Sequence, residues 1–433
     1  MNGRMLVALI AATAGFGQSP LRSSSTSPVT LNLDDALARA RQHGGQIQSA
    51  NLSVLQAKED RVQARAAALP SLNAFNQFIY TEGNHTPSGV FVANDGVHVY
   101  NEQAVVHQEL LSAVRRGEIR RAMAAEAVAR AKVEVAIRGL NFTVVQDYYA
   151  IIAAERKARN SQTSVQEAQR FFEITQKQEK GGEVAHADVI KSQIDLQQRQ
   201  RDALEAQLAI EKAKIALGVL IFPNFGADFS VVDDLQQGAL PPVPGESHVQ
   251  TVETSPDLKA AKASVQQAGY EVNVARFAYL PSFALDFFYG INANQFALRT
   301  PERRNLGYSA QATLNIPVWN WGATRSKVKQ AELKRDQAQL DLSVAQRTLD
   351  SNLALYTAEA NAAQSQLASL RSSVGLATES LRLTLLRYQA GEATALEVVD
   401  AQNTATLTRN ALDDGLSRYG VALANLQILT GKF

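Results

Sequence analysis

The chain repeats itself once, and this duplication constrains its fold more than any other feature of the sequence. The segment ARAAALPSL (64–72) recurs as ARFAYLPSF (275–283), and GEVAHADVIKSQ (182–193) recurs as GEATALEVVDAQ (391–402). The two pairs stand in the same order with nearly the same offset, which is typical of an internal duplication. We therefore expect each half of the chain to contain the same series of structural elements.

The repeats are predicted at 31–221 and 248–431. Between them, residues 222–247 are rich in proline and glycine, as expected of a linker. At the start of the chain, Arg4 is followed by an apolar stretch and then by small residues, which is the pattern of a secretory signal peptide at 1–17. We therefore expect the chain to be exported.

Apolar residues recur every seven positions through long parts of each half, which is typical of helices that pack side by side along their length. The series includes Val144, Ile151, Val189 and Leu196 in the first half, and Leu353, Leu367, Val398 and Ala405 in the second. No proline interrupts the pattern from about 112 to 180. At 1.5 Å per residue this helix would be roughly 100 Å long, far longer than a compact domain. Gly181 and Gly182, and later Gly391, are predicted to form the turns into returning helices.

Two segments in each half change their period from seven to two. They lie at about 71–83 and 96–111, and at about 281–295 and 308–318. One face of each predicted strand is apolar and the other is polar or small. This suits a barrel with lipid outside and water inside, although a soluble sandwich gives the same alternation. Four strands cannot enclose a water-filled lumen, so a membrane barrel would require several chains.

Composition narrows the choice of function. The chain has 43 basic and 42 acidic side chains, a balance that argues against nucleic acid as a partner. It has no cysteine, and its six histidines show no metal-ligand spacing. We therefore expect no metal and no cofactor.

Several motifs give the chain a family resemblance over nearly its whole mature length. They are LNLDDALARA (31–40), the duplicated LPSL and LPSF, IPVWNWGATRSKV (316–328) and RYQAGEATALEVVDAQ (387–402). In their order and duplication the chain resembles the TolC family of outer-membrane efflux proteins. The resemblance implies a mainly α-helical fold with membrane β-strands. It also implies homotrimers in which each protomer gives four strands to one shared outer-membrane barrel. The helices of the three protomers would form a tunnel across the periplasm.

The resemblance also implies partners. Such a channel is a passive duct that works with a periplasmic adaptor and an inner-membrane pump. The pump is either a proton-driven transporter of the RND class or an ABC transporter. The channel also contacts outer-membrane lipid. Export of small molecules is the expected function. An exit duct for type I protein secretion is the alternative.

At the hairpin tip, Glu397 and Asp400 are three residues apart, so they share one face of a helix. The resemblance places them in a charged ring at the closed periplasmic entrance of the trimer. It places Asp188 and Tyr388 in the polar links that hold neighbouring helices together there. Ala393 stands where some family members have an arginine, and Glu397 replaces a more usual aspartate, so the links of this chain are expected to differ.

Three other interpretations are open from the residues alone. Glu397 and Asp400 are also compatible with a solvated acidic helix face, or with the carboxylate pair of a glycoside hydrolase. The chain shows no compact α/β pattern around which an active site would be built, so we do not expect an enzyme. A secreted coiled-coil scaffold would explain the heptads but not the apolar strand faces.

Overall fold

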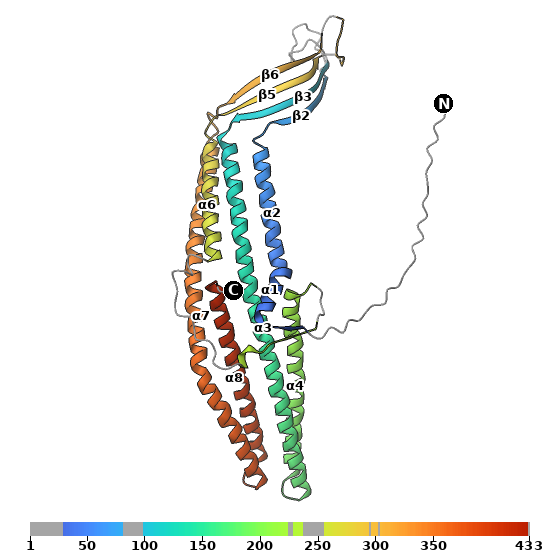
Figure 1. The fold of residues 1–433 in the computed structure, drawn as a ribbon, viewed down its shortest axis with the longest axis vertical. Coiled ribbons are helices and arrows are strands. Elements are labelled where there is room, and N and C mark those ends of the chain that lie inside the picture. The colour runs from blue at the N-terminus through green and yellow to red at the C-terminus, as the bar shows by residue number, and fades with distance from the viewer. Residues whose placement is uncertain are drawn as a thin grey trace, which may run out of the picture.

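The computed structural model describes residues 29–80, 98–223, 228–236, 255–293, 296–301 and 304–431. The predicted signal peptide and most of the predicted linker lie outside these ranges. The described chain forms one elongated body, with a sheet at one end and two helical hairpin tips at the other (Figure 1).

Each half of the chain has a strand–strand–long-helix–helix series, so the predicted duplicated fold is confirmed. The first half contains α1 (Leu33–His43), α2 (Gly45–Ala66), β2 (Ser71–Tyr80), β3 (His98–Leu111), α3 (Ala113–Lys180) and α4 (His186–Ile221). The second contains α6 (Pro256–Phe277), β5 (Ser282–Ala293), β6 (Leu306–Asn315), α7 (Ala323–Gln389) and α8 (Ala395–Leu429). Helices α3 and α7 have 68 and 67 residues, so each is roughly 100 Å long.

The seven-residue pattern explains how the helices pair. Val144, Ile151, Leu353, Val398 and Ala405 are all buried, because residues seven apart return to the same face of a helix. Helix α3 packs along α4, and α7 packs along α8, so each half forms an antiparallel hairpin. Among the described residues, no helix combines the length and the apolar composition that crossing a bilayer requires.

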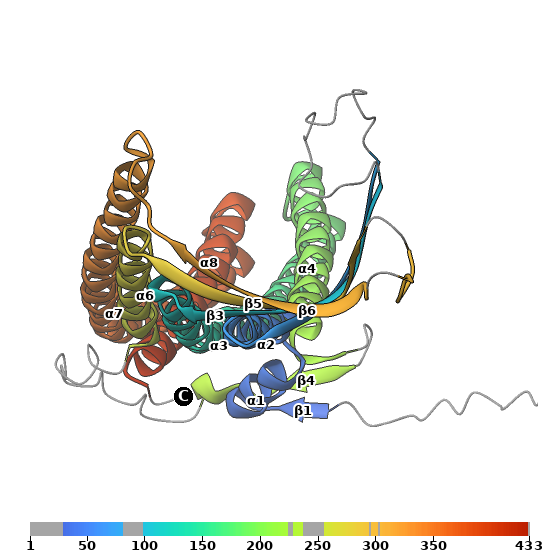
Figure 2. The same ribbon diagram turned by 90° about the horizontal axis from the view of Figure 1, so that it is seen from above.

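The four long strands form one antiparallel sheet in the order β2-β3-β5-β6. Its central pair, β3 and β5, joins the two repeats, and Figure 2 shows the sheet as a curved band above the helices. The apolar residues of β5 lie on the same face of the sheet as apolar residues of the two neighbouring strands. Phe287, for example, lies opposite Val106 on β3 and Ala310 on β6. The outer strands β2 and β6 each have one side without a partner strand in the described protomer.

The last strand differs from the prediction of 308–318. β6 begins at Leu306 and ends at Asn315, which pairs with Ser282, the first residue of β5. Residues 316–318 therefore have no neighbouring strand to pair with, and Pro317 lacks a backbone N–H. The first predicted strand continues only to Tyr80 in the described chain, and residues 81–83 lie outside it.

The predicted linker contains structure that the sequence did not indicate. Strand β4 (Phe229–Val231) pairs in parallel with β1 (Val29–Leu31), and a short 3₁₀ helix, η1, follows at Asp234–Gln236. Phe229, Val231 and Leu31 join the main hydrophobic core beside α1, α3 and α4. This segment therefore packs against the middle of the helical body.

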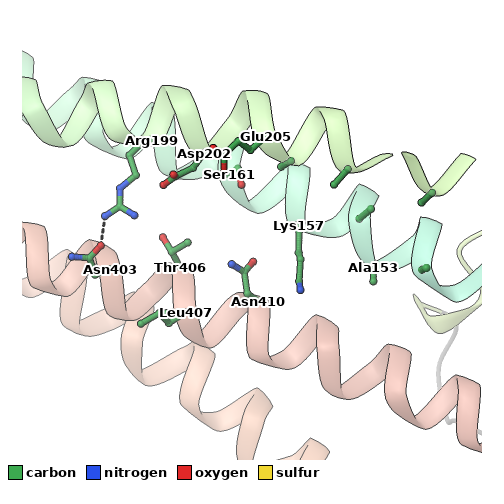
Figure 3. Close-up of a pocket in the computed structure, with 15 residues that line it drawn as sticks. Ala153, Lys157, Ser161, Arg199, Asp202, Glu205, Asn403, Thr406, Leu407 and Asn410 are labelled. Atoms are coloured by element: carbon green, nitrogen blue, oxygen red, sulfur yellow. Dashed lines mark hydrogen bonds between the residues drawn. The ribbon is translucent and has the colours of Figure 1, made fainter. Parts of the chain in front are cut away.

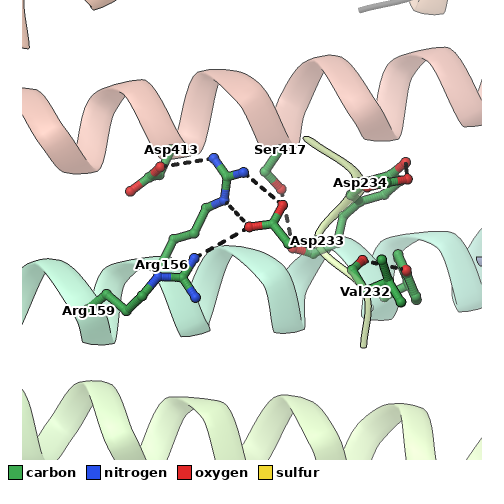
Figure 4. Close-up of polar contacts among 9 residues, drawn as sticks. Arg156, Arg159, Val232, Asp233, Asp234, Asp413 and Ser417 are labelled. Atoms are coloured by element: carbon green, nitrogen blue, oxygen red, sulfur yellow. Dashed lines mark hydrogen bonds and ion pairs between the residues drawn. The ribbon is translucent and has the colours of Figure 1, made fainter. Parts of the chain in front are cut away.

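A buried arginine attaches the same segment to both repeats. Arg156 on α3 donates hydrogen bonds to both carboxylate oxygens of Asp233, at 2.7 and 2.8 Å, and to Asp413 on α8 at 3.2 Å (Figure 4). Only 7% of the Arg156 side chain is exposed. Nearby, the Tyr148 hydroxyl donates to the carbonyl oxygen of Val232 at 2.7 Å. These contacts fix the segment across the α3–α8 contact.

Candidate functional site at the helical tips

The two hairpin tips lie together at the end of the molecule opposite the sheet (Figure 1). Gly182 and Gly391 both have the left-handed backbone conformation, with φ of 75° and 77°. After each glycine the next amide closes the turn: Glu183 N–H donates to the carbonyl of Gln178, and Glu392 N–H to the carbonyl of Arg387, both at 2.8 Å. The tips are therefore built alike, as the duplicated sequence predicts.

Gly181 has a different conformation from Gly182. It ends α3 with φ of −78°, in the right-handed region that any residue adopts. A Cβ built at Gly181 would lie 3.4 Å from the nearest atom, the Gln178 carbonyl oxygen. Of the three predicted turn glycines, only Gly182 and Gly391 therefore need to be glycine for backbone reasons.

A small apolar cluster joins the two hairpins near their tips. Phe171 of α3 packs edge-on against Tyr388 of α7, with ring centroids 5.1 Å apart, and both contact the first turn of α8 through Ala395 and Val398. Tyr388 is only 2% exposed, and its hydroxyl has no hydrogen-bond partner among the described residues. Burial, and secondarily the nearby charge of Asp188, raises the pKa of Tyr388 to about 12.

Glu397 is occupied by contacts within its own protomer. The Thr394 side chain accepts from the Glu397 N–H, while a Glu397 carboxylate oxygen accepts from both the N–H and the hydroxyl of Thr394 at 3.1 Å. This reciprocal capping box begins α8. Arg387 also lies 3.6 Å from the carboxylate. The Thr394 hydrogen bonds, with a smaller contribution from Arg387, lower the pKa of Glu397.

Asp400 lies one turn further along α8 and is exposed. Its carboxylate makes no hydrogen bond or ion pair with another part of the chain that the structure describes; only its backbone carbonyl is used, as acceptor from Thr404. Asp400 therefore presents its carboxylate to solvent or to a neighbouring molecule. The two acidic residues that the sequence groups together have different environments.

The equivalent position in the first repeat lacks the capping box. Asp188 is half-buried, and Ala185 precedes α4 where Thr394 precedes α8, so no side chain caps this helix. Asp188 lies close enough to Tyr388 to influence its pKa, but no hydrogen bond joins them. His186 contacts Glu179, with 2.6 Å between Nδ1 and the carboxylate, and so is not a partner of the α8 acids.

Above the tips, a groove of about 780 Å³ runs between α4 and α8, with α3 beside it. Figure 3 shows Arg199 of α4 reaching across it to Asn403 of α8, whose side-chain oxygen accepts from the guanidinium. Arg199 also pairs with Asp195 at 3.2 Å, and both side chains are more than nine-tenths buried. Our sequence predictions omitted this contact. The sequence indicates the contact only through the position of Arg199, which lies on the same buried heptad face of α4 as Val189, Ser192 and Leu196.

Several further polar contacts between the hairpins join α3 to α8. Asn160 donates to Asp413 at 2.7 Å, the hydroxyls of Ser164 and Thr406 lie 2.8 Å apart, and Arg409 donates to Glu167 at 2.9 Å. These hydrogen bonds add to the main hydrophobic core, which also joins the hairpins through Tyr149 and Ile152 of α3 and Tyr419 of α8. No group of three or more His, Asp or Glu residues in the described ranges is placed to hold a metal ion.

Comparison with known proteins identifies the fold. A family model described as "Outer membrane efflux protein" matches residues 36–221 and 249–432, one match for each repeat. The chain belongs to the outer membrane efflux protein family. Its helices are accordingly periplasmic, its location is the outer membrane, and its function is that of an outer-membrane efflux channel. Members of this family form trimeric channels that work with adaptor proteins and inner-membrane pumps.

Individual relatives agree with the family assignment. The outer membrane protein TolC of Vibrio cholerae is 23% identical over 95% of this chain and 93% of its own length. The outer membrane efflux protein BepC of Brucella suis is 25% identical, but the match spans 45% of this chain and 42% of that protein. The CmeC outer membrane channel of Campylobacter jejuni has the same fold, with a TM-score of 0.82, 17% identity, and coverage of 98% of this chain and 94% of that one.

Proposed function

We propose that this protein is the outer-membrane duct of a tripartite efflux system and passes small molecules from an inner-membrane pump through a homotrimeric tunnel. A periplasmic adaptor and a pump of the RND or ABC class are the proposed partners. The role is passage rather than catalysis, so we assign no enzymatic activity. Export of proteins by a type I secretion system is the alternative for the same duct.

The observation that carries the proposal is that the described protomer has two sides on which another copy can bind. Strands β2 and β6 each have an outer side without a partner strand in the described protomer, so another copy can continue the sheet from each of them. Below the sheet, α4 and α7 lie on opposite sides of the body (Figures 1 and 2). Large apolar side chains are exposed along both helices, including Ile194, Leu204 and Leu208 of α4 and Leu340 and Leu376 of α7. A head-to-tail contact that closes into a ring would cover both surfaces.

Within the trimer we propose that Asp400 forms the charged part of the periplasmic entrance. Three copies would bring three free carboxylates to one constriction, which raises the local cation concentration and resists anions. We assign Glu397 mainly to the start of α8, because its carboxylate is engaged by Thr394 and Arg387. Asp188 and Tyr388 are the proposed linking pair, since the buried Tyr388 hydroxyl makes no hydrogen bond within the described part of the chain.

Complementation tests the function. The protein, expressed in a Gram-negative host that lacks its own efflux duct but keeps an adaptor and pump, should be recovered in the outer membrane as a trimer and should lower the accumulation of a fluorescent pump substrate. Leu340→Glu combined with Leu208→Glu should abolish both the trimer and efflux. Gln339→Glu, an exposed change one residue away, is the matched control. Recovery in the soluble periplasm, or a monomeric wild-type protein, would rule the duct out.

A further inference from the structure

A pocket of about 360 Å³ lies where the central strands meet the helices, between the start of α3 and the end of α6. Leu111, Phe277, Leu280 and Pro281 form its apolar wall, and Arg116 and Arg120 lie beside that wall on successive turns of α3. An apolar hollow beside two cations has the chemistry of an amphiphilic anion site.

The two arginines are exposed and have no ion pair among the residues that the structure describes. Their neighbours differ: Arg115 pairs with Glu109 and Arg121 pairs with Glu118, each at 2.7 Å. Like charges at positions i and i+4 of a helix are unfavourable without a counterion. Arg116 and Arg120 therefore provide positive charge that this protomer leaves unbalanced.

The pocket adjoins the apolar face of the sheet. Leu111 is the register partner of Phe283, the first residue in the apolar row of β5. Further exposed apolar side chains follow the end of β6: Val318, Trp319 and Trp321 are each at least 75% exposed. The two indole rings pack edge-on. Exposed tryptophans at the end of an apolar surface are typical of a membrane–water interface. The arginines lie on the helical side of this boundary, where headgroups of the inner leaflet are found.

Subunit contacts are not expected to cover this pocket. Near the sheet, contacts place the helices in the order α2, α3, α6 and α7, and Figure 1 shows α3 and α6 between the other two. The pocket lies between the two inner helices. A neighbouring protomer added at β2 or β6 would meet the outer helices first, so it would not lie over the pocket between α3 and α6.

We propose that Arg116 and Arg120 bind the phosphate of an anionic phospholipid in the inner leaflet, while its glycerol and upper acyl segment lie against Leu111, Phe277 and Leu280. Guanidinium groups suit this role because their planar donors bind phosphate oxygens in pairs. Basic pockets at the membrane surface recognise lipid headgroups through the same chemistry. The site would hold the sheet at a defined depth in the bilayer.

Native mass spectrometry of the purified trimer, titrated with phosphatidylglycerol or phosphatidylcholine, tests the proposal. The wild type should retain phosphatidylglycerol preferentially. Arg116→Gln with Arg120→Gln should reduce this retention by roughly fivefold for each arginine removed. The matched control is Arg115→Gln with Arg121→Gln, which removes the same charge from the same helix but from paired positions. This control should retain phosphatidylglycerol as the wild type does.

Equal losses in the two double variants would overturn the proposal, because net charge alone would then explain binding. If the Arg116→Gln, Arg120→Gln variant does not assemble, the wild-type protein still tests the proposal. Equal retention of phosphatidylglycerol and phosphatidylcholine by the wild type would overturn the proposal. Displacement of phosphatidylglycerol by excess inorganic phosphate alone would reveal a general anion site and contradict the lipid assignment. Loss of efflux in the variants is not part of the test, so the lipid site and the duct can fail independently.

Discussion

Gly182 and Gly391 turn the two hairpins with nearly identical backbone angles, φ of 75° and 77°, although they are 209 residues apart in the chain. Gly182→Ala and Gly391→Ala should each destabilise their tip by about 1–2 kcal/mol, because a Cβ is unfavourable in the left-handed conformation. Gly181→Ala is the matched control and should have little effect, since Gly181 has φ of −78°. Protease sensitivity at the tips and thermal unfolding of the trimer measure the difference. Equal effects at 181 and 182 would contradict the assignment.

Charge at the entrance should depend on Asp400 more than on Glu397. Asp400→Asn removes an exposed carboxylate that has no partner among the described residues of its protomer. We therefore expect a higher conductance of the closed channel and weaker block by multivalent cations in planar bilayers. Glu397→Gln should change the block less, because Thr394 and Arg387 already engage that carboxylate. Asp341→Asn, an exposed change on α7 remote from the tip, is the control. An unchanged block in the Asp400 variant would exclude this residue from the constriction.

The capping box makes the start of α8 sensitive to acid. The hydrogen bonds from Thr394 lower the pKa of Glu397 below its ordinary value of 4.5. A lowered pKa in the folded state means that the stabilising contribution is complete above the unfolded value and is lost as the pH falls through the folded one. Wild type and Glu397→Gln should therefore differ in stability at neutral pH, and the difference should shrink as the pH falls below the ordinary value of 4.5.

Thr394→Ala removes the hydroxyl that caps the Glu397 N–H, but residue 394 keeps the backbone N–H that donates to the carboxylate. This variant should therefore lose stability at acid as well as neutral pH. Glu392→Gln, which neutralises an exposed carboxylate in the same turn, is the matched control and should follow the wild-type pH profile. Thermal unfolding of the trimer across this pH range is the measurement. A difference between wild type and Glu397→Gln that persists unchanged at acid pH would show that the carboxylate charge is not involved.

The arginine at the middle of the body should contribute far more to stability than its neighbour. Arg156→Met leaves Asp413 largely buried without its cation and leaves Asp233 with only the exposed Arg159, so we expect a loss of roughly 3–5 kcal/mol. Arg159→Met, whose side chain is 55% exposed and 3.4 Å from Asp233, should cost about 0–1 kcal/mol. Denaturant unfolding followed by circular dichroism compares the two variants. Similar losses would show that Arg156 is not the principal contact.

Much of the fold could be predicted because its periods are long and regular. A residue such as Val398 lies on the buried face of an amphipathic helix whatever the partner helix is, so the heptads alone predict the hairpins. The alternating strands were predictable for the same reason, with a period of two. Strands β1 and β4 have three residues each, too few to show a period, and they are ordered only by pairing with one another and with the core.

The tip shows where prediction from the sequence stops. Thr394 and Glu397 have the spacing of a capping box, a local signal that could have distinguished Glu397 from Asp400. The contact of Arg199 with Asn403 had only a weak signal, because its two residues are 204 apart in the chain. The same is true of Arg156, which meets Asp233 and Asp413 only after three separate segments have packed together.

The sequence by itself determined the duplication, because the repeated segments can be compared directly. It also determined the paired long helices, the alternating strands and the positions of the tip glycines, because each of these depends on residues close together in the chain. The tertiary structure alone decided which strands are neighbours, which polar side chains join the hairpins, and which acidic residue remains free at the tip. These features depend on long-range contacts, whose energies are set by burial and by the geometry of the partners. The spacing of residues along one helix predicts which face is buried, but not which polar side chain of another segment lies opposite that face.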